Sequence, residues 1–157
     1  PNQRFREFGV RNKFNPMPEV LTGKRVIVVD DSIVRGTTTP HIVSLVRRAG
    51  ALEVHMRVCA PPIKHPCYFG VDMPHKSELL ANGRSLEQIR KFIGADSLGY
   101  LSIDSVKNVV AYEPNSHRGF CDACFTGEYP MAVQLEMDKL ALEHSVSDSN
   151  EPLALAD

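Results

Sequence analysis

The sequence predicts an α/β fold in which a parallel sheet is flanked by helices. A short run of β-branched residues at 25–29 is typical of a strand buried on both faces, as in parallel sheets. A helical pattern follows it, and residues 53–60 then alternate between apolar and polar side chains as a half-buried strand does. Strand, helix and strand in this order form a βαβ unit, whose crossover should be right-handed.

Composition limits the classes of protein to which the chain can belong. Its 157 residues are enough for one domain, and 43% hydrophobic with 24% charged residues excludes global disorder. A net charge of -1 argues against a nucleic-acid partner. Apolar runs are only a few residues long, so we expect no membrane span.

The start of the chain and its cysteines bear on location. No basic segment followed by an apolar one is visible, and the chain holds four cysteines. We therefore expect a reducing, cytoplasmic location, where cysteines serve as metal ligands or buried thiols more often than as disulfides. The first residue is Pro1, so we expect a processed chain or a piece of a longer one.

The first strand and helix follow from local signals. We expect residues 26–30 to be an interior strand and a helix to begin within two residues of Thr38. Thr39 can cap this helix, Pro40 suits its first position and Gly50 can end it. One face of the helix is apolar: Ile42, Leu45, Val46 and Ala49.

The later elements are predicted in the same way. In the strand at 53–60, the drier face consists of Val54, Met56, Val58 and Ala60. Residues 61–75 hold four prolines and are expected to form a loop. Two helices follow at 76–81 and 86–93, the second with a capping box of Ser85 and Gln88. The remaining expectations are a strand at 98–101, a helix at 102–111, an irregular segment at 114–130, a helix at 131–144 and a frayed tail from 145.

The segment between the first strand and its helix carries the clearest chemistry. In a parallel sheet, ligands bind at the carboxyl ends of the strands, and a helix start attracts anions. Gly36 allows close backbone approach, and three threonines at 37–39 add hydroxyl donors. Asp30 and Asp31 would repel a phosphate but suit ribose hydroxyls or Mg²⁺. Together these residues predict a sugar-phosphate site.

Residues 26–38 resemble the phosphoribosyl-pyrophosphate (PRPP) signature of type I phosphoribosyltransferases. More narrowly, residues 30–38 are similar to the form found in the glutamine PRPP amidotransferases. Further stretches resemble the same family in the same order: 10–15, 65–74, 93–98 and 121–127. The resemblance covers nearly the whole chain, to about residue 130.

This resemblance implies a partial type I phosphoribosyltransferase fold with an irregular, cysteine-bearing C-terminal segment. Its expected parts are the transferase portion at 1–112, the iron–sulfur-ligand segment and last helix at 113–144, and a disordered tail at 145–157. The chain would be a C-terminal fragment of the family's iron–sulfur branch. The glutaminase half and the start of the transferase domain would then be missing.

The implied activity is the committed step of purine biosynthesis. Ammonia released from glutamine displaces pyrophosphate from PRPP and gives 5-phosphoribosylamine, under feedback by purine nucleotides and in a homo-oligomer. Asp30 and Asp31 would bind the ribose hydroxyls and Mg²⁺, and Lys13 would approach the pyrophosphate leaving group. The implied PRPP-binding residues that complete the set are Ser32, Arg35, Gly36, Thr37 and Thr38.

The cysteines leave several kinds of site open. Cys121 and Cys124 form a CxxC, which on its own could be a zinc half-site, a redox pair or an iron–sulfur half-site. Cys67 lies in a proline-flanked loop. The resemblance implies that these three cysteines ligate a [4Fe–4S] cluster with a fourth ligand outside this chain. Cys59 is a rival fourth ligand, but we interpret it as a strand-end thiol.

Two other functions compete with the enzyme fragment. A non-catalytic PRPP-binding regulator would keep residues 30–38 but would not need the three cysteines or the 10–15 segment. A free-standing phosphoribosyltransferase for a base would need a pyrophosphate-binding turn and a base hood, neither of which is visible. The features that are present therefore favour the amidotransferase.

Overall fold

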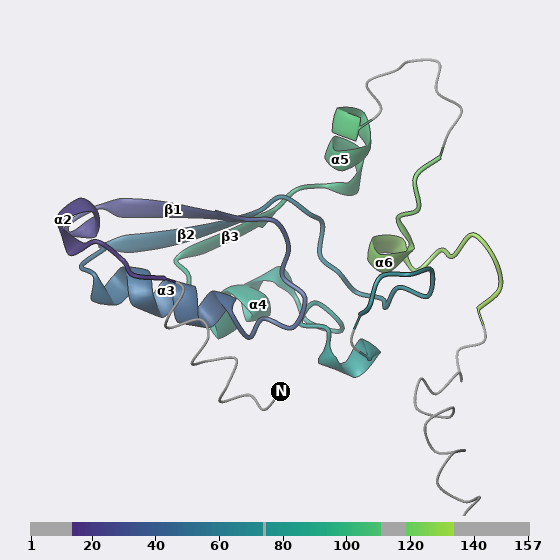
Figure 1. The fold of residues 1–157 in the computed structure, drawn as a ribbon, viewed down its shortest axis with the longest axis horizontal. Helices are drawn as coiled ribbons and strands as arrows, with labels where there is room; N and C mark the ends of the chain where they lie inside the picture. The colour runs from purple at the N-terminus through teal and green to yellow at the C-terminus, as the bar shows by residue number, and fades with distance from the viewer. Residues whose placement is uncertain (1–13, 74, 111–118, 134–157) are drawn as a thin grey trace, which may run out of the picture.

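The computed structural model describes residues 14–73, 75–110 and 119–133 (Figure 1). Its centre is a parallel sheet of three strands in the order β1-β2-β3. The strands are β1 (Arg25–Asp30), β2 (Glu53–Val58) and β3 (Ser97–Tyr100). In register, Val28 of β1 lies beside Met56 of β2, which lies beside Leu98 of β3. The predicted parallel α/β architecture is confirmed.

Helices connect the strands, and further helices come after the last strand in the chain. α3 (Thr39–Arg48) joins β1 to β2, and α4 (Leu86–Ile93) lies between β2 and β3 in the chain. Both lie along the same face of the sheet (Figure 1). The shorter elements are α2 (Pro18–Leu21), the 3₁₀ turn η1 (Lys76–Glu78), α5 (Ile103–Val110) and α6 (Ala123–Thr126). Within the described ranges, no helix has the length and apolar character needed to cross a membrane.

The hydrophobic core lies between this face and the two long helices. Val54 and Met56 of the central strand are fully buried, and Val43 of α3 and Ile93 of α4 pack against the same cluster. The predicted alternation in β2 is therefore confirmed. In α3 the most buried apolar side chain near its middle is Val43, not a member of the predicted apolar face.

β1 differs from its predicted interior position. Among the described residues it pairs only with β2, so it lies at the edge of this sheet. Its Ile27 and Val29 are 63% and 66% exposed, because no described element covers the second face of the sheet. The expectation of an interior strand covered on both faces is wrong for the part of the chain that the structure describes.

The predicted signals at the helix ends are mostly correct. α3 begins at Thr39, so Thr38 and not Thr39 is the N-cap residue, and Pro40 occupies the second helical position. Gly50 follows the helix with φ +95, as expected of a terminating glycine. The capping box of Ser85 and Gln88 is present, with both of its hydrogen bonds formed.

Other boundaries need correction. β2 ends at Val58, so Cys59 follows the strand instead of lying in it, and β3 begins one residue earlier than predicted. The helix expected at 76–81 is only the turn η1, because Leu79 and the two residues after it are all buried. Three consecutive buried residues do not fit a helix with one apolar face; Leu79 is extended, and residues 80–83 form a turn. α5 lies within its predicted range.

The C-terminal expectations are only partly within view. The irregular segment contains one helical turn, α6, which includes Cys124. Residues 131–133 are not helical. The remainder of the predicted last helix and the tail lie outside the described residues.

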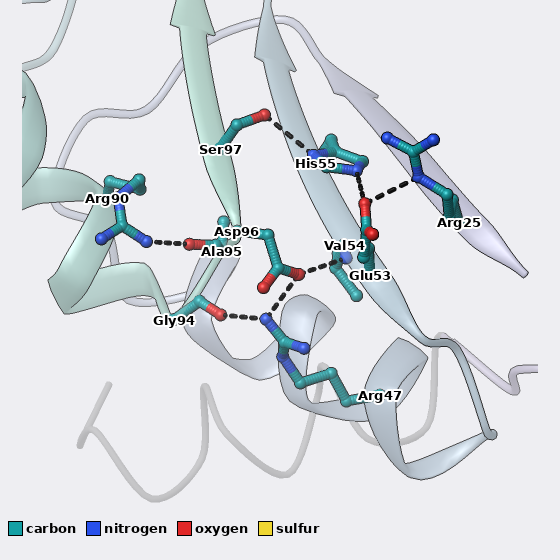
Figure 2. A network of polar contacts seen from close by, with 10 residues as sticks. All are labelled: Arg25, Arg47, Glu53, Val54, His55, Arg90, Gly94, Ala95, Asp96 and Ser97. Atoms are coloured by element: carbon teal, nitrogen blue, oxygen red, sulfur yellow. Dashed lines mark hydrogen bonds and ion pairs between the residues drawn. The ribbon is translucent and has the colours of Figure 1, made fainter.

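Polar contacts join the sheet to α3 at the amino ends of β2 and β3 (Figure 2). The Oδ2 atom of Asp96 accepts hydrogen bonds from the backbone N–H of Val54 at 2.6 Å and from Arg47 Nη2 at 2.8 Å. On the uncovered face, His55 lies between Ser97 Oγ at 2.9 Å and Glu53 Oε2 at 2.8 Å. These contacts join β2 to the start of β3 and to α3.

Candidate sugar-phosphate site

A cavity of about 290 Å³ opens where β1 ends and α3 begins. This is the edge of a parallel sheet at which ligands are expected to bind. The cavity is lined by Asp30, Ser32, Ile33, Val34, Arg35, Gly36, Thr37, Thr38 and Thr39. The sugar-phosphate loop predicted from the sequence therefore forms one concave surface.

The neighbouring strand fixes the acidic end of this loop. The backbone N–H of Cys59 donates to the carbonyl of Asp30 at 2.9 Å, and that of Ala60 donates to the carbonyl of Asp31 at 3.0 Å. These bonds continue the β1–β2 pairing beyond the strands. Ile33, only 2% exposed, anchors the loop in the core.

The two carboxylates have different surroundings. Asp30 lines the cavity, and its Oδ1 atom accepts a hydrogen bond from the backbone N–H of Asp31 at 3.1 Å. The side chain of Asp31 is exposed beside the cavity and accepts a hydrogen bond from Ser32 Oγ at 3.0 Å. Oxygen acceptors at this edge suit hydroxyl groups and hard cations.

Gly36 forms the tightest point of the loop. Its φ is +69, and a Cβ atom at this position would lie 2.5 Å from Leu80 Cδ2 and 3.2 Å from Phe92 Cε1. Only glycine fits both the left-handed backbone and the space above Leu80. Thr38 makes no side-chain capping bond to α3, and its side chain is exposed at the cavity.

The cation of the loop has a partner from a distant part of the chain. Arg35 Nε lies 2.8 Å from Glu78 Oε2, and both side chains are partly exposed. The hydrogen bond from Arg35 holds the pKa of the Glu78 carboxyl below its usual range. The pair is therefore charged at neutral pH.

The predicted PRPP residues thus mostly gather in one place. Asp30, Ser32 and the residues from Arg35 to Thr38 line the cavity, and Asp31 lies at its edge. Lys13 lies outside the described residues.

The cysteines form a second group around the loop after β2. The backbone N–H groups of Lys64 and His65 both donate to the carbonyl of Cys124 at 3.0 Å. The hydroxyl of Tyr129 donates to the carbonyl of Pro66 at 2.7 Å. The loop that carries Cys67 is therefore held against the segment that carries the CxxC.

Three of the thiols influence one another electrostatically. Burial raises the pKa of the Cys124 thiol, and the nearby Cys67 and Cys121 raise it further. All four described cysteines are free thiols. In residues 14–73, 75–110 and 119–133, no group of three histidine, cysteine or acidic side chains has the spacing to hold a metal ion as it stands.

Two residues at these sites were not predicted from the sequence. Glu78 pairs with a residue 43 positions away, and Tyr129 bonds to a carbonyl 63 positions away. Neither belongs to a local motif, and only covariation between distant positions could have identified them.

The chain is similar to known amidophosphoribosyltransferases. It is 50% identical over 145 residues to the chloroplastic amidophosphoribosyltransferase of Glycine max, a match that covers 92% of this chain and 25% of that protein. It is 43% identical to the amidophosphoribosyltransferase of Mycobacterium bovis, covering 100% of this chain and 31% of that protein. No protein-family model matches the chain.

Solved structures support the same relationship. The glutamine PRPP amidotransferase from B. subtilis complexed with ADP and GMP superposes with a TM-score of 0.70 at 49% identity, covering 83% of this chain and 29% of that one. A structure described as the allosteric regulatory enzyme of purine biosynthesis gives a TM-score of 0.70 at 48% identity. The chain spans a quarter to a third of its curated relatives in Glycine max and Mycobacterium bovis. Over that length it is a homologue of the amidophosphoribosyltransferases.

Proposed function

We propose that the protein carrying this chain makes 5-phosphoribosylamine from PRPP and glutamine, and that this chain holds its PRPP and Mg²⁺ site. The observation that carries the proposal is the cavity at the end of β1, which is lined by Asp30 and by most of residues 31–38, here called the phosphate loop. A non-catalytic regulator would account for the loop. It would not account for identities of 43% and 50% to amidophosphoribosyltransferases over nearly the whole chain.

The two ends of the cavity suit the two ends of PRPP. Residues 35–38, with the start of α3, present hydroxyl groups and a helix N-terminus to the 5-phosphate. Asp30 and Asp31 accept hydrogen bonds from the ribose hydroxyls. Their oxygens also suit Mg²⁺, which would neutralise charge on the pyrophosphate leaving group. We further propose that Lys13 assists departure of the pyrophosphate, and that ammonia comes from glutamine hydrolysed outside this chain.

Binding measurements test the site directly. PRPP is titrated into the protein by calorimetry with and without Mg²⁺. Asp30→Asn should weaken PRPP binding about tenfold, because it removes a charge from contacts to hydroxyls and to the cation. Asp104→Asn, an exposed position on α5, is the matched control and should bind as the wild type does. Wild-type protein without measurable PRPP affinity would overturn the proposal.

We also propose that Cys67, Cys121 and Cys124 ligate a [4Fe–4S] cluster whose fourth ligand lies outside this chain. The chemistry of the donors supports this, since iron–sulfur clusters are held by thiolates, although the three thiols do not have ligand spacing in the described structure. The cluster would order these loops further, because metal binding and local folding are coupled.

Chemical analysis distinguishes this set from a site that uses Cys59. After anaerobic purification, iron and sulfide are measured together with the charge-transfer absorbance. Cys121→Ser should abolish both, whereas Cys59→Ser should leave them unchanged. Loss of the cluster in Cys59→Ser with retention in Cys67→Ser would show that our ligand set is wrong.

The nucleotides in the B. subtilis complex suggest the effectors. That relative is complexed with ADP and GMP. We propose that purine nucleotides also regulate the present protein. Inhibition of PRPP turnover by these two nucleotides is the measurement that tests this.

A further inference from the structure

We propose that Glu78 is a positioning residue, which orients the guanidinium of Arg35 toward the phosphate group of the bound substrate. The inference rests on the PRPP site proposed above. It adds a residue from a separate segment, outside the phosphate loop.

The contact leaves most of the guanidinium available. Glu78 Oε2 lies 2.8 Å from Arg35 Nε. An arginine carries five N–H donors, four of them on its two terminal nitrogens. A carboxylate on Nε restricts rotation of the planar group while the terminal nitrogens stay free to bind phosphate oxygens.

Glu78 itself stands on a segment that is fixed to the phosphate loop. The backbone N–H of Leu80 donates to the carbonyl of Val34 at 2.8 Å. The side chain of Leu80 is 2% exposed and fills the space beside Gly36. Asn82 Nδ2 closes the turn with a bond to the carbonyl of Lys76 at 3.0 Å. Glu78 therefore lies at a defined place relative to Arg35.

The charges around Arg35 explain why the orientation of its guanidinium matters for phosphate binding. Within residues 30–39 Arg35 is the single cation, and the same stretch carries the carboxylates of Asp30 and Asp31. An exposed ion pair contributes little to folding, typically no more than about 1 kcal/mol. The consequence of losing Glu78 should therefore appear in phosphate binding more than in stability.

The test compares PRPP binding and turnover in matched variants. Glu78→Ala should weaken PRPP binding by about threefold to fivefold, the scale of one exposed ion pair. It should raise the KM for PRPP while leaving kcat nearly unchanged. Glu78→Gln keeps an acceptor oxygen and should recover part of the affinity. Glu87→Ala is the control, because Glu87 forms a similar pair with Arg90 on α4 at 2.6 Å.

A double-mutant cycle shows whether Glu78 acts through Arg35. In an Arg35→Ala background, Glu78→Ala should have no further effect on PRPP affinity. An equal effect in both backgrounds would overturn the proposal, as would tighter binding by Glu78→Ala, which would mean that Glu78 masks Arg35. If wild-type protein binds no PRPP, the proposed function itself fails; if it binds and Glu78→Ala matches it, only the positioning role fails.

Discussion

At the scale of single residues, Gly36 shows how closely the phosphate loop depends on its support. The loop turns at φ +69 directly against Leu80, so a side chain at this point has neither the backbone conformation nor the room it needs. Gly83 has nearly the same φ, +70, but nothing within 4 Å of a Cβ atom. A comparison of the two glycines therefore distinguishes the cost of backbone strain, which both share, from the cost of a steric clash, which only Gly36 would have.

We predict that Gly36→Ala destabilises the fold much more than Gly83→Ala. Both changes place an alanine in the left-handed region, at a cost of about 1–2 kcal/mol. Gly36→Ala should cost about 1–3 kcal/mol more, because Leu80 must move inside a packed core. Urea unfolding of the two variants measures the difference. Equal losses would show that Leu80 yields without cost.

A second prediction concerns the alkaline stability of the protein. Burial raises the pKa of Tyr100 to about 12, and its hydroxyl has no hydrogen-bond partner among the described residues. Above pH 10 the tyrosine ionises in the unfolded chain while it stays protonated in the folded one. Its contribution to the free energy of unfolding is therefore full below about pH 10 and is lost as the pH rises toward 12.

Tyr100→Phe should accordingly reduce the loss of stability between pH 10 and 12. Denaturant titrations at several alkaline pH values measure this, and ultraviolet titration should show one late-titrating tyrosine fewer. Tyr68→Phe, at a partly exposed position, is the control. An unchanged pH profile in Tyr100→Phe would mean that this hydroxyl titrates as it does in water.

The single residues of the phosphate loop could be predicted from the sequence because they are adjacent in the chain. A strand end, a glycine and three threonines in succession predict a turn between strand and helix, at the sheet edge where ligands bind in parallel α/β folds. The contact between Arg35 and Glu78 could not be predicted, because it depends on the path of the long, proline-containing segment between β2 and α4. Local sequence patterns do not predict such contacts between distant positions.

At the scale of elements, the connecting segment between β2 and α4, residues 59–85, contacts both candidate sites. It starts at Cys59 and Ala60, bonded to the carbonyls of the acidic pair. It then carries Cys67 to the CxxC segment and returns to bond with Val34 through Leu80. One continuous segment thus contacts the cysteine group and both the start and the middle of the phosphate loop.

We expect Tyr129 to hold this connecting segment against the CxxC segment. Its hydroxyl bonds to the carbonyl of Pro66 at 2.7 Å, and its ring contacts Tyr68 edge-on with centroids 5.2 Å apart. If the proposed cluster is present, we predict that Tyr129→Phe, which keeps the ring, loses it faster in air than wild type does, whereas Tyr129→Ala loses it faster still. Decay of the charge-transfer absorbance measures the rate. Identical decay in all three proteins would show that the contacts of Tyr129 do not hold the two segments together.

Element types were easier to predict than element ends. The helix α4 matched its predicted range because the capping box and Gly94 mark both of its ends. The run after Lys76 lacked such marks, and tertiary burial of Leu79 and Leu80 ended the helix after one turn. Burial by distant segments is a tertiary effect, so propensity alone could not reveal it.

At the scale of the whole molecule, the sheet determines where the site lies, and its uncovered face explains the main error of prediction. The apolar run in β1 correctly indicated a parallel strand. It also suggested burial on both sides, yet Ile27 and Val29 are exposed in the described structure. Sequence patterns report what a strand can bury, whereas actual burial depends on which elements are present to cover it.

The strand register is held at the opposite end of the sheet from the cavity by Asp96 (Figure 2). Its carboxylate joins β2, through the N–H of Val54, to α3, through Arg47. The hydrogen bond from Val54 and then that from Arg47 lower the pKa of Asp96. A lowered pKa means that the stabilisation is present above the unfolded value of about 3.9 and is lost as the pH falls toward the folded value.

We therefore predict that Asp96→Ala lowers the free energy of unfolding near neutral pH by about 1 kcal/mol. This is less than the full value of a charged hydrogen bond, because the side chain is partly exposed and screened by solvent. The difference from wild type should shrink as the pH falls below about 4, since wild type then loses the same interaction. Glu87→Ala provides the comparison, because Glu87 also has a lowered pKa but, among the described residues, forms its ion pairs within α4. Denaturant unfolding at pH 7 and at pH 3 should thus give a pH-dependent loss of stability for Asp96→Ala and a smaller loss for Glu87→Ala. A loss for Asp96→Ala that persists unchanged at pH 3 would show that the carboxylate charge does not link the sheet to α3.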